Sequence, residues 1–201
     1  MPLPENPLVL NGGCNCGAIR YKIDIPEKAK RPLHPLSNGE VTFPVVLTDH
    51  CNDCRKATGS ILPTWICVPI TMMTCKLEPV TAAEDDDETT WFPVDSLFYP
   101  GPSTSKYWLK FYKSSDRATR SFCGRCGTNL TYSTISSSMK DFPKIFDVVL
   151  GTIDRADLEK DWMAPDRHCW VSCEIEWIKE LTNGAPSMPR HPSFKLDEHA
   201  E

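Results

Sequence analysis

The sequence has 201 residues, which is enough for one ordinary domain and hardly enough for two. Hydrophobic residues make up 40% and charged residues 24%, so a packed core is feasible and global disorder is not expected. A net charge of −5 gives no support to a nucleic-acid-binding surface.

Neither a secretion signal nor a membrane segment is expected. Residues 1–6 lack a basic segment followed by an apolar one, and no run approaches the roughly 20 apolar residues of a membrane helix. We therefore expect a cytoplasmic protein with no membrane partner, in a compartment that keeps thiols reduced. Its ten cysteines are then metal ligands, reactive thiols or buried apolar thiols, whereas a disulfide framework would require secretion.

Short alternating or β-branched runs predict a mainly β protein. The run at residues 18–25 places Tyr21, Ile23 and Ile25 on one face. Eighteen prolines against ten glycines favour strands and loops, and helix signals are limited to single turns at residues 54–58 and 155–160. Further strands are expected at residues 45–47, 65–70, 107–112, 129–133, 146–152 and 169–173.

The same reading predicts a single domain. We expect an N-terminal extension at residues 1–8, one domain at residues 9–180 and a C-terminal tail at residues 181–201 that is rich in proline, serine and charge. Within the domain, the stretch from about residue 78 to 105 contains the acidic run 84–88 and is expected to be a solvated surface insert.

Two cysteine pairs more than a hundred residues apart are the strongest signal. Cys14 and Cys16 lie in GGCNCG (12–17), and Cys123 and Cys126 lie in FCGRCG (122–127). The neighbouring glycines permit the positive φ angles that such tight turns need. Four thiolates are the ligand set of a tetrahedral structural zinc, which can contribute on the order of 10 kcal/mol of apparent binding energy. We therefore expect zinc to join the two segments; four unrelated buried thiols would leave the glycines unexplained.

A third, incomplete cluster lies between these pairs. Cys51 and Cys54 are separated by two residues, and Asp49 precedes Cys51 by two, so in an extended segment both side chains lie on one side. Two thiolates and a carboxylate would leave one coordination position open, as in catalytic zinc sites. His50 points to the other side by the same alternation and is a weaker ligand candidate. The sequence therefore allows a second, catalytic zinc.

Other interpretations of this cluster remain open. The basic pair Arg55 and Lys56 follows Cys54, and nearby positive charge lowers thiol pKa values and favours the thiolate. A thioredoxin-like redox pair of Cys51 and Cys54 is one alternative, although the surrounding βαβ pattern is missing. A vestigial or purely structural cluster is another. The remaining cysteines are expected to be small buried apolar residues: Cys67, Cys75, Cys169 and Cys173.

Four segments, in order along the chain, resemble the glutathione-dependent formaldehyde-activating enzyme family, which includes centromere protein V. Residues 13–21 (GCNCGAIRY) resemble its GxCxCGxxRY segment, and residues 51–60 (CNDCRKATGS) resemble its CxxCRxxxGS segment. Residues 122–130 resemble its FCxxCGxxL segment, and residues 151–154 with Pro165, His168 and Trp177 resemble its downstream GxLD…P…H…W pattern. The resemblance covers about residues 9–178.

The resemblance implies a β-tent fold, in which antiparallel sheets are pinned by zinc at Cys14, Cys16, Cys123 and Cys126. It also implies a carbon–sulfur lyase that acts on glutathione or other thiol adducts of small carbonyl compounds. Asp49, Cys51 and Cys54 would be its catalytic residues, with Arg55, Lys56 and Ser60 binding substrate. The alternative for the basic pair is a solvated surface position.

Asp49 is where this sequence departs from the family pattern. Catalytic members hold a second zinc with a Cys-x-Cys-x-x-Cys run, and here the first of the three positions is an aspartate. The departure favours a rival hypothesis, a non-catalytic binding module that keeps only the structural zinc.

Overall fold

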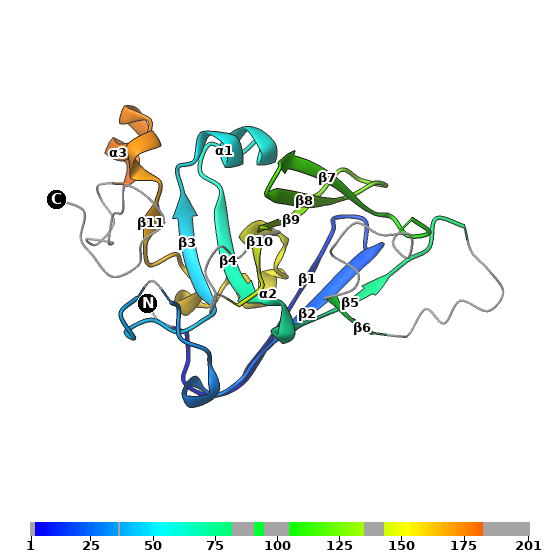
Figure 1. Ribbon diagram of the computed structural model, residues 1–201, viewed down its shortest axis with the longest axis horizontal. Helices are drawn as coiled ribbons and strands as arrows, with labels where there is room; N and C mark the ends of the chain where they lie inside the picture. Colours follow the sequence, from blue (N-terminus) through cyan, green and yellow to red (C-terminus); the bar gives the residue numbers. More distant parts are fainter. Residues whose placement is uncertain (1–2, 36, 82–90, 95–104, 135–142, 183–201) are drawn as a thin grey trace.

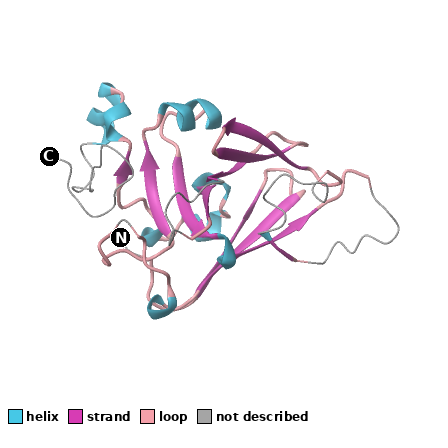
Figure 2. Ribbon diagram, viewed as in Figure 1, coloured by secondary structure: helices cyan, strands magenta, loops and turns pink. Residues whose placement is uncertain are grey.

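The computed structural model describes residues 3–35, 37–81, 91–94, 105–134 and 143–182, which form two β-sheets with a few short helices (Figures 1 and 2). The predicted mainly β class is confirmed. The acidic run 84–88 and the tail from residue 183, for which the sequence predicts a surface insert and an extended tail, lie outside the described residues. Within the described part, none of the helices has the length and apolar character needed to span a bilayer.

The smaller sheet follows the predicted alternation closely. Tyr21, Ile23 and Ile25 are buried on one face of its second strand, as expected. This apolar face packs into the larger of two hydrophobic clusters, where burial of each large side chain contributes roughly 1.5–3 kcal/mol. The strands lie in the order β1 (Leu8–Gly13), β2 (Ile19–Ile25), β5 (Met73–Leu77) and β6 (Phe92–Pro93).

The larger sheet carries the second cysteine pair and most of the candidate site. Its neighbours are antiparallel except for β11, which runs parallel to β3 and places Cys169 opposite Asp49. The strands lie in the order β11 (His168–Cys169), β3 (Val45–Asp49), β4 (Thr64–Pro69), β10 (Ile145–Val149), β9 (Asn129–Thr134), β8 (Ala118–Cys123) and β7 (Leu109–Ser115).

A second hydrophobic cluster lies on this sheet beneath the candidate site. Its buried members include Leu47, Cys54 and Trp65. Helix α1 (Asn52–Thr58) follows β3 directly and ends at Gly59, whose φ of 70° suits a glycine cap. The cluster therefore fixes both the end of β3 and the start of α1.

The remaining helical elements are short. Helix α2 (Arg155–Leu158) follows the predicted position, whereas α3 (Glu176–Thr182) had no signal in our reading. Five 3-10 turns complete the described chain: Lys28–Lys30, Ile70–Met72, Leu150–Thr152, Asp161–Met163 and Val171–Cys173.

The prediction of a strand at residues 169–173 is wrong. Only His168–Cys169 pairs with β3, and Trp170 then adopts a left-handed conformation with φ of 57°. Such a residue turns the backbone out of the extended path, so Val171–Cys173 continues as a 3-10 turn. The strands β1, β5, β6 and β8 were not predicted, although the structure contains them.

Candidate metal centres and the adjoining cavity

The two cysteine pairs meet at one point between the sheets. Cys14 and Cys16 follow β1, and Cys123 ends β8, with Cys126 in the next turn. The sulfurs of Cys14 and Cys16 are 3.6 Å apart, and those of Cys16 and Cys123 are 3.8 Å apart. Sulfurs bound tetrahedrally to one zinc at about 2.3 Å lie about 3.8 Å from one another. The spacing fits a shared metal ion, and all four sulfurs lie within 4.8 Å of one another.

Backbone turns hold the two pairs in the same way. The Gly17 amide donates to the Cys14 carbonyl at 3.1 Å, and the Gly127 amide donates to the Cys123 carbonyl at 2.8 Å. Both glycines have positive φ angles, 82° and 75°, as the sequence predicts. The site is compatible with zinc joining the smaller sheet to the larger one.

The thiols of this cluster differ in acidity. Burial raises the pKa of Cys123 to about 12. Burial acts in the same direction on Cys126, but hydrogen bonds from the Thr128 side chain and backbone outweigh it and lower the pKa of Cys126 to about 6. A metal ion binds thiolates, so it must displace the protons of the buried members, and its affinity depends on pH.

The incomplete cluster also assembles as predicted. Ligand atoms of Asp49, Cys51 and Cys54 all lie within 4.8 Å of one another. His50 points the opposite way, as the alternation along β3 requires, and its Nε2 lies 2.7 Å from Nδ1 of His168. Two thiols and a carboxylate could therefore hold a metal ion with a position left for a further ligand.

Asp49 is firmly oriented within this cluster. Its Oδ1 accepts a hydrogen bond from the Cys51 amide at 2.8 Å, and its Oδ2 accepts one from Nε1 of Trp65 at 3.0 Å. Asp49 is buried, with 4% of its surface exposed. Each carboxylate oxygen can accept more than one hydrogen bond or metal contact. These two hydrogen bonds therefore orient the carboxylate and leave it able to bind a metal.

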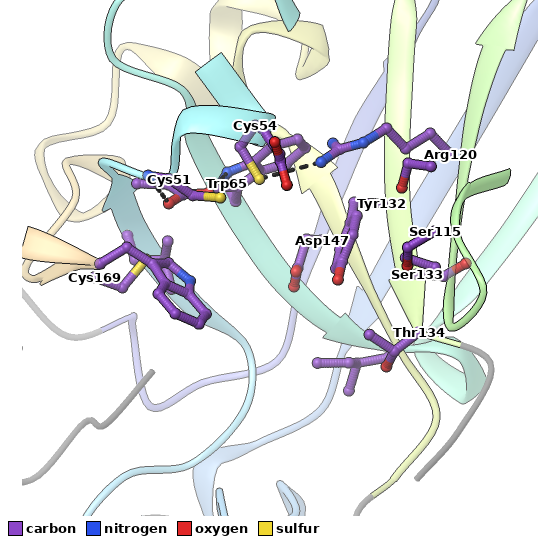
Figure 3. A pocket seen from close by; sticks show the side chains of 17 residues that line it. Cys51, Cys54, Trp65, Ser115, Arg120, Tyr132, Ser133, Thr134, Asp147 and Cys169 are labelled. Atoms are coloured by element: carbon purple, nitrogen blue, oxygen red, sulfur yellow. Dashed lines mark hydrogen bonds between the residues drawn. The ribbon is translucent and has the colours of Figure 1, made fainter. Parts of the chain in front are cut away.

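A cavity of about 320 Å³ adjoins the incomplete cluster (Figure 3). Ligand pockets in proteins span roughly 300–1,000 Å³, so this one suits a small molecule or the reacting end of a larger one. Its wall comes from β3, α1, β4, β7, β8, β9, β10 and β11. The residues that carry its chemistry are Asp49, Cys51, Asp53, Cys54, Arg120, Tyr132, Asp147 and Cys169.

Arg120 is the cation of this wall. It enters from β8 and is 4% exposed, and its Nη2 donates to the sulfur of Cys54 at 3.3 Å (Figure 3). Its guanidinium lies 4.7 Å from the centre of the Tyr132 ring. Within the described residues, no carboxylate forms an ion pair with Arg120, and its Nε has no hydrogen-bond partner. A buried cation without a direct ion pair is costly, so this position favours a thiolate at Cys54 or an anionic ligand.

The prediction of a lowered thiol pKa is wrong for Cys54. Burial raises the pKa of Cys54 well above its usual range, and the charge of Asp49 adds to the increase. Arg120 acts in the opposite direction, through its hydrogen bond and its charge. A thiolate at Cys54 is therefore favoured by Arg120, and a bound metal ion would favour it further.

The predicted substrate-binding residues lie outside the cavity wall. Arg55 donates from Nη2 to the side chain of Asn52 at 3.3 Å, and Lys56 is exposed on α1. Ser60 is exposed beyond the helix, where its amide contacts Thr58. Their role in substrate binding stays a prediction.

Three of the four remaining cysteines are buried as expected, namely Cys67, Cys75 and Cys169. Cys173 is half-buried, because the 3-10 turn places it near the surface. Cys169 has a further position that the sequence did not reveal, since it lines the cavity beside Asp49.

The cavity residues that the sequence did not single out include Arg120, Tyr132, Asp147 and Cys169. Only Asp147 left a visible signal, because an acidic residue interrupts the otherwise apolar run at residues 145–149. The others come from strands whose neighbours are set by the topology of the sheet.

No protein-family model matches the chain, and no curated protein matches it in sequence. The family resemblance therefore stays a prediction, and the function has to be argued from the site itself.

Proposed function

We propose that this protein is a zinc-dependent carbon–sulfur lyase that acts on adducts of glutathione or another thiol with a small carbonyl compound. The cavity beside Asp49, Cys51 and Cys54 is the observation that carries the proposal. A closed four-sulfur site has no room for substrate, whereas a three-ligand site that opens into a cavity does.

The residues of the cavity suit the charge changes of such a reaction. When a hemithioacetal breaks, the carbon–sulfur electron pair stays on sulfur and a thiolate forms. A zinc ion at Asp49, Cys51 and Cys54 would supply a Lewis acid for this thiolate or for the carbonyl oxygen. Arg120 adds a guanidinium on the same side of the cavity, 3.3 Å from Cys54. Its position in a buried site strengthens its interaction with a developing negative charge.

The proposal includes a zinc at each cluster and a reducing compartment such as the cytoplasm. All ten cysteines are free thiols, which supports metal binding in place of a disulfide framework. The amide-bonded turns of the four-cysteine cluster give that zinc a structural role.

Cys54→Ser tests the proposal. We expect the variant to keep one zinc per chain in place of two and to lose about 100-fold or more of its lyase activity, because a ligand of the open site is removed. The measurements are elemental analysis and the rate of breakdown of the glutathione adducts of formaldehyde and of a larger aldehyde. Cys173→Ser is the matched control, since Cys173 is a half-buried thiol outside both clusters and the cavity.

Unchanged activity in Cys54→Ser would remove the incomplete cluster from the mechanism. One zinc per chain in the wild type, with no activity on either adduct, would favour the non-catalytic binding module. The two hydrogen bonds that engage Asp49 are the observation in favour of that rival, because they give Asp49 a structural role without any metal.

A further inference from the structure

Asp147 is the one carboxyl group at the floor of the cavity that no structural contact fully accounts for. It lies on β10, in the middle of the larger sheet, opposite Cys67 of β4 and Tyr132 of β9. The Cys67 thiol hydrogen-bonds to the carboxyl group. Oδ1 is nevertheless buried without a hydrogen-bond partner in the described part of the chain. A buried acceptor left unpaired is destabilising, so a native protein seldom keeps one without a role.

The proposed reaction needs such a group. To break a hemithioacetal, the enzyme must remove the proton of its hydroxyl group. The electron pair of the oxygen–hydrogen bond then forms the second carbon–oxygen bond. The electron pair of the carbon–sulfur bond stays on the departing sulfur. The products are an aldehyde and a thiolate, and the proton remains on the base until it returns to the thiolate or to water.

The other ionisable groups of the cavity do not suit this task. Asp49 is engaged by two hydrogen bonds beside the cysteines, and Asp53 is exposed on α1. Burial raises the pKa of Tyr132 to about 12, so the phenol keeps its proton at neutral pH. Burial likewise raises the pKa of the Cys169 thiol far above neutrality. With Cys51 and Cys54 assigned to the metal, Asp147 remains among the described acidic groups of the wall.

We infer that Asp147 accepts the hydroxyl proton of the thiol adduct while Arg120 stabilises the sulfur that leaves. The inference rests on the proposed lyase function and adds two residues to it. Asp147 and Arg120 both line the cavity, and the Arg120 guanidinium lies beside Cys54, as Figure 3 shows. A substrate whose sulfur lies beside Arg120 and the cysteines can direct its hydroxyl group toward Asp147. The preferred ligand is accordingly a small hydroxyalkyl thioether.

The pKa of Asp147 is consistent with a role as a general base. Burial raises the pKa of Asp147 to about 6, and the charge of Asp49 adds to the increase. The groups that interact with it are Cys67 on β4, Tyr132 on β9, Arg120 on β8, Asp49 on β3 and Cys169 on β11. A general base works best when its pKa lies near the working pH. Cleavage requires the ionised form, so the rate should rise as pH increases through about 6.

Asp147→Asn is the first test, with S-hydroxymethylglutathione as substrate. We expect kcat/KM for cleavage to fall about 10²- to 10⁴-fold, as for loss of a general base, with the zinc content unchanged. The rise in rate near pH 6 should disappear. Asp24→Asn is the matched control, because Asp24 is an exposed carboxylate on β2, outside the cavity. It should leave both the rate and the pH profile as in the wild type.

Asp147→Ala distinguishes a catalytic role of the carboxylate from a purely structural one. The deletion leaves space at the cavity floor, and added formate should restore part of the lost rate. Activity of Asp147→Asn within a few-fold of the wild type would overturn the inference and leave the lyase function standing. Lost activity that formate does not restore would assign Asp147 a structural role and also overturn it. An inactive wild type that carries both zinc ions would overturn the lyase function and the inference together.

Discussion

The two cysteine clusters are built from similar short motifs, yet they differ in what surrounds them. The four-sulfur cluster lies between two sheets, and its cysteines come from two tight turns. The Asp49–Cys51–Cys54 cluster belongs to one strand and the helix that follows it, and it opens into a cavity of about 320 Å³. We expect metal binding at the first cluster to stabilise the folded state, and metal binding at the second to create a site for a ligand in the cavity. Variants at the two should therefore separate stability from activity.

Cys14→Ser should produce the largest effect. Structural zinc can contribute on the order of 10 kcal/mol of apparent binding energy, which is comparable to the whole stability of a domain. Cys14 is buried, and its sulfur also accepts a hydrogen bond from the Ile19 amide at 3.3 Å. We expect loss of this zinc and unfolding of most of the chain at 25 °C, measured by elemental analysis and circular dichroism.

Cys54→Ser provides the comparison for that variant. It should keep the structural zinc and melt within a few degrees of the wild type. If Cys14→Ser instead melts like Cys54→Ser, the four-sulfur cluster does not hold the sheets together. Chelation of the wild type should then also leave the circular dichroism unchanged.

The structural cluster could be predicted because its information is local. Each cysteine pair carries its own turn glycine, and Gly17 and Gly127 have the positive φ that the sequence pattern requires. The meeting of the two pairs follows from the ligand number of zinc. Strand alternation likewise placed Asp49 with Cys51 and turned His50 away.

The cavity could not be predicted in the same way, because its wall comes from eight elements. Arg120 and Asp147 reach the site through the order of strands in the larger sheet, which no local pattern specifies. Nearness in sequence was misleading for Arg55 and Lys56. Successive residues of a helix are rotated by about 100° about the helix axis. Because Cys54 is on the buried face of α1, Arg55 and Lys56 lie on other faces of the helix.

Asp49→Ala should have an intermediate effect on stability, and it should affect both the fold and the second metal site. Removal of the carboxylate leaves the buried indole of Trp65 without its acceptor, and an unsatisfied buried donor costs about 1–3 kcal/mol. We expect the free energy of unfolding to fall by about that amount in urea titrations, together with loss of the second metal. Asp53→Ala, at an exposed position on α1, should change stability by less than about 0.5 kcal/mol.

A different result at Asp49 would sharpen the assignment. If the second metal stays bound in Asp49→Ala while stability falls, Asp49 is a structural acceptor and the metal is held by Cys51 and Cys54 with other groups. Cys169 would then be the next ligand to examine, because it lies opposite Asp49 in the sheet and lines the same cavity.

Arg125→Ala should have the smallest effect, although Arg125 lies between Cys123 and Cys126 of the four-sulfur cluster. Its Nη1 contacts both carboxylate oxygens of Glu78, at 2.7 and 2.9 Å, in an ion pair exposed on both sides. Exposed pairs contribute about 0–1 kcal/mol, far less than a structural metal. We expect thermal melting and zinc content close to those of the wild type. A large loss of either would mean that the ion pair positions the turn for its metal, because the sulfur geometry alone would then be insufficient to form the site.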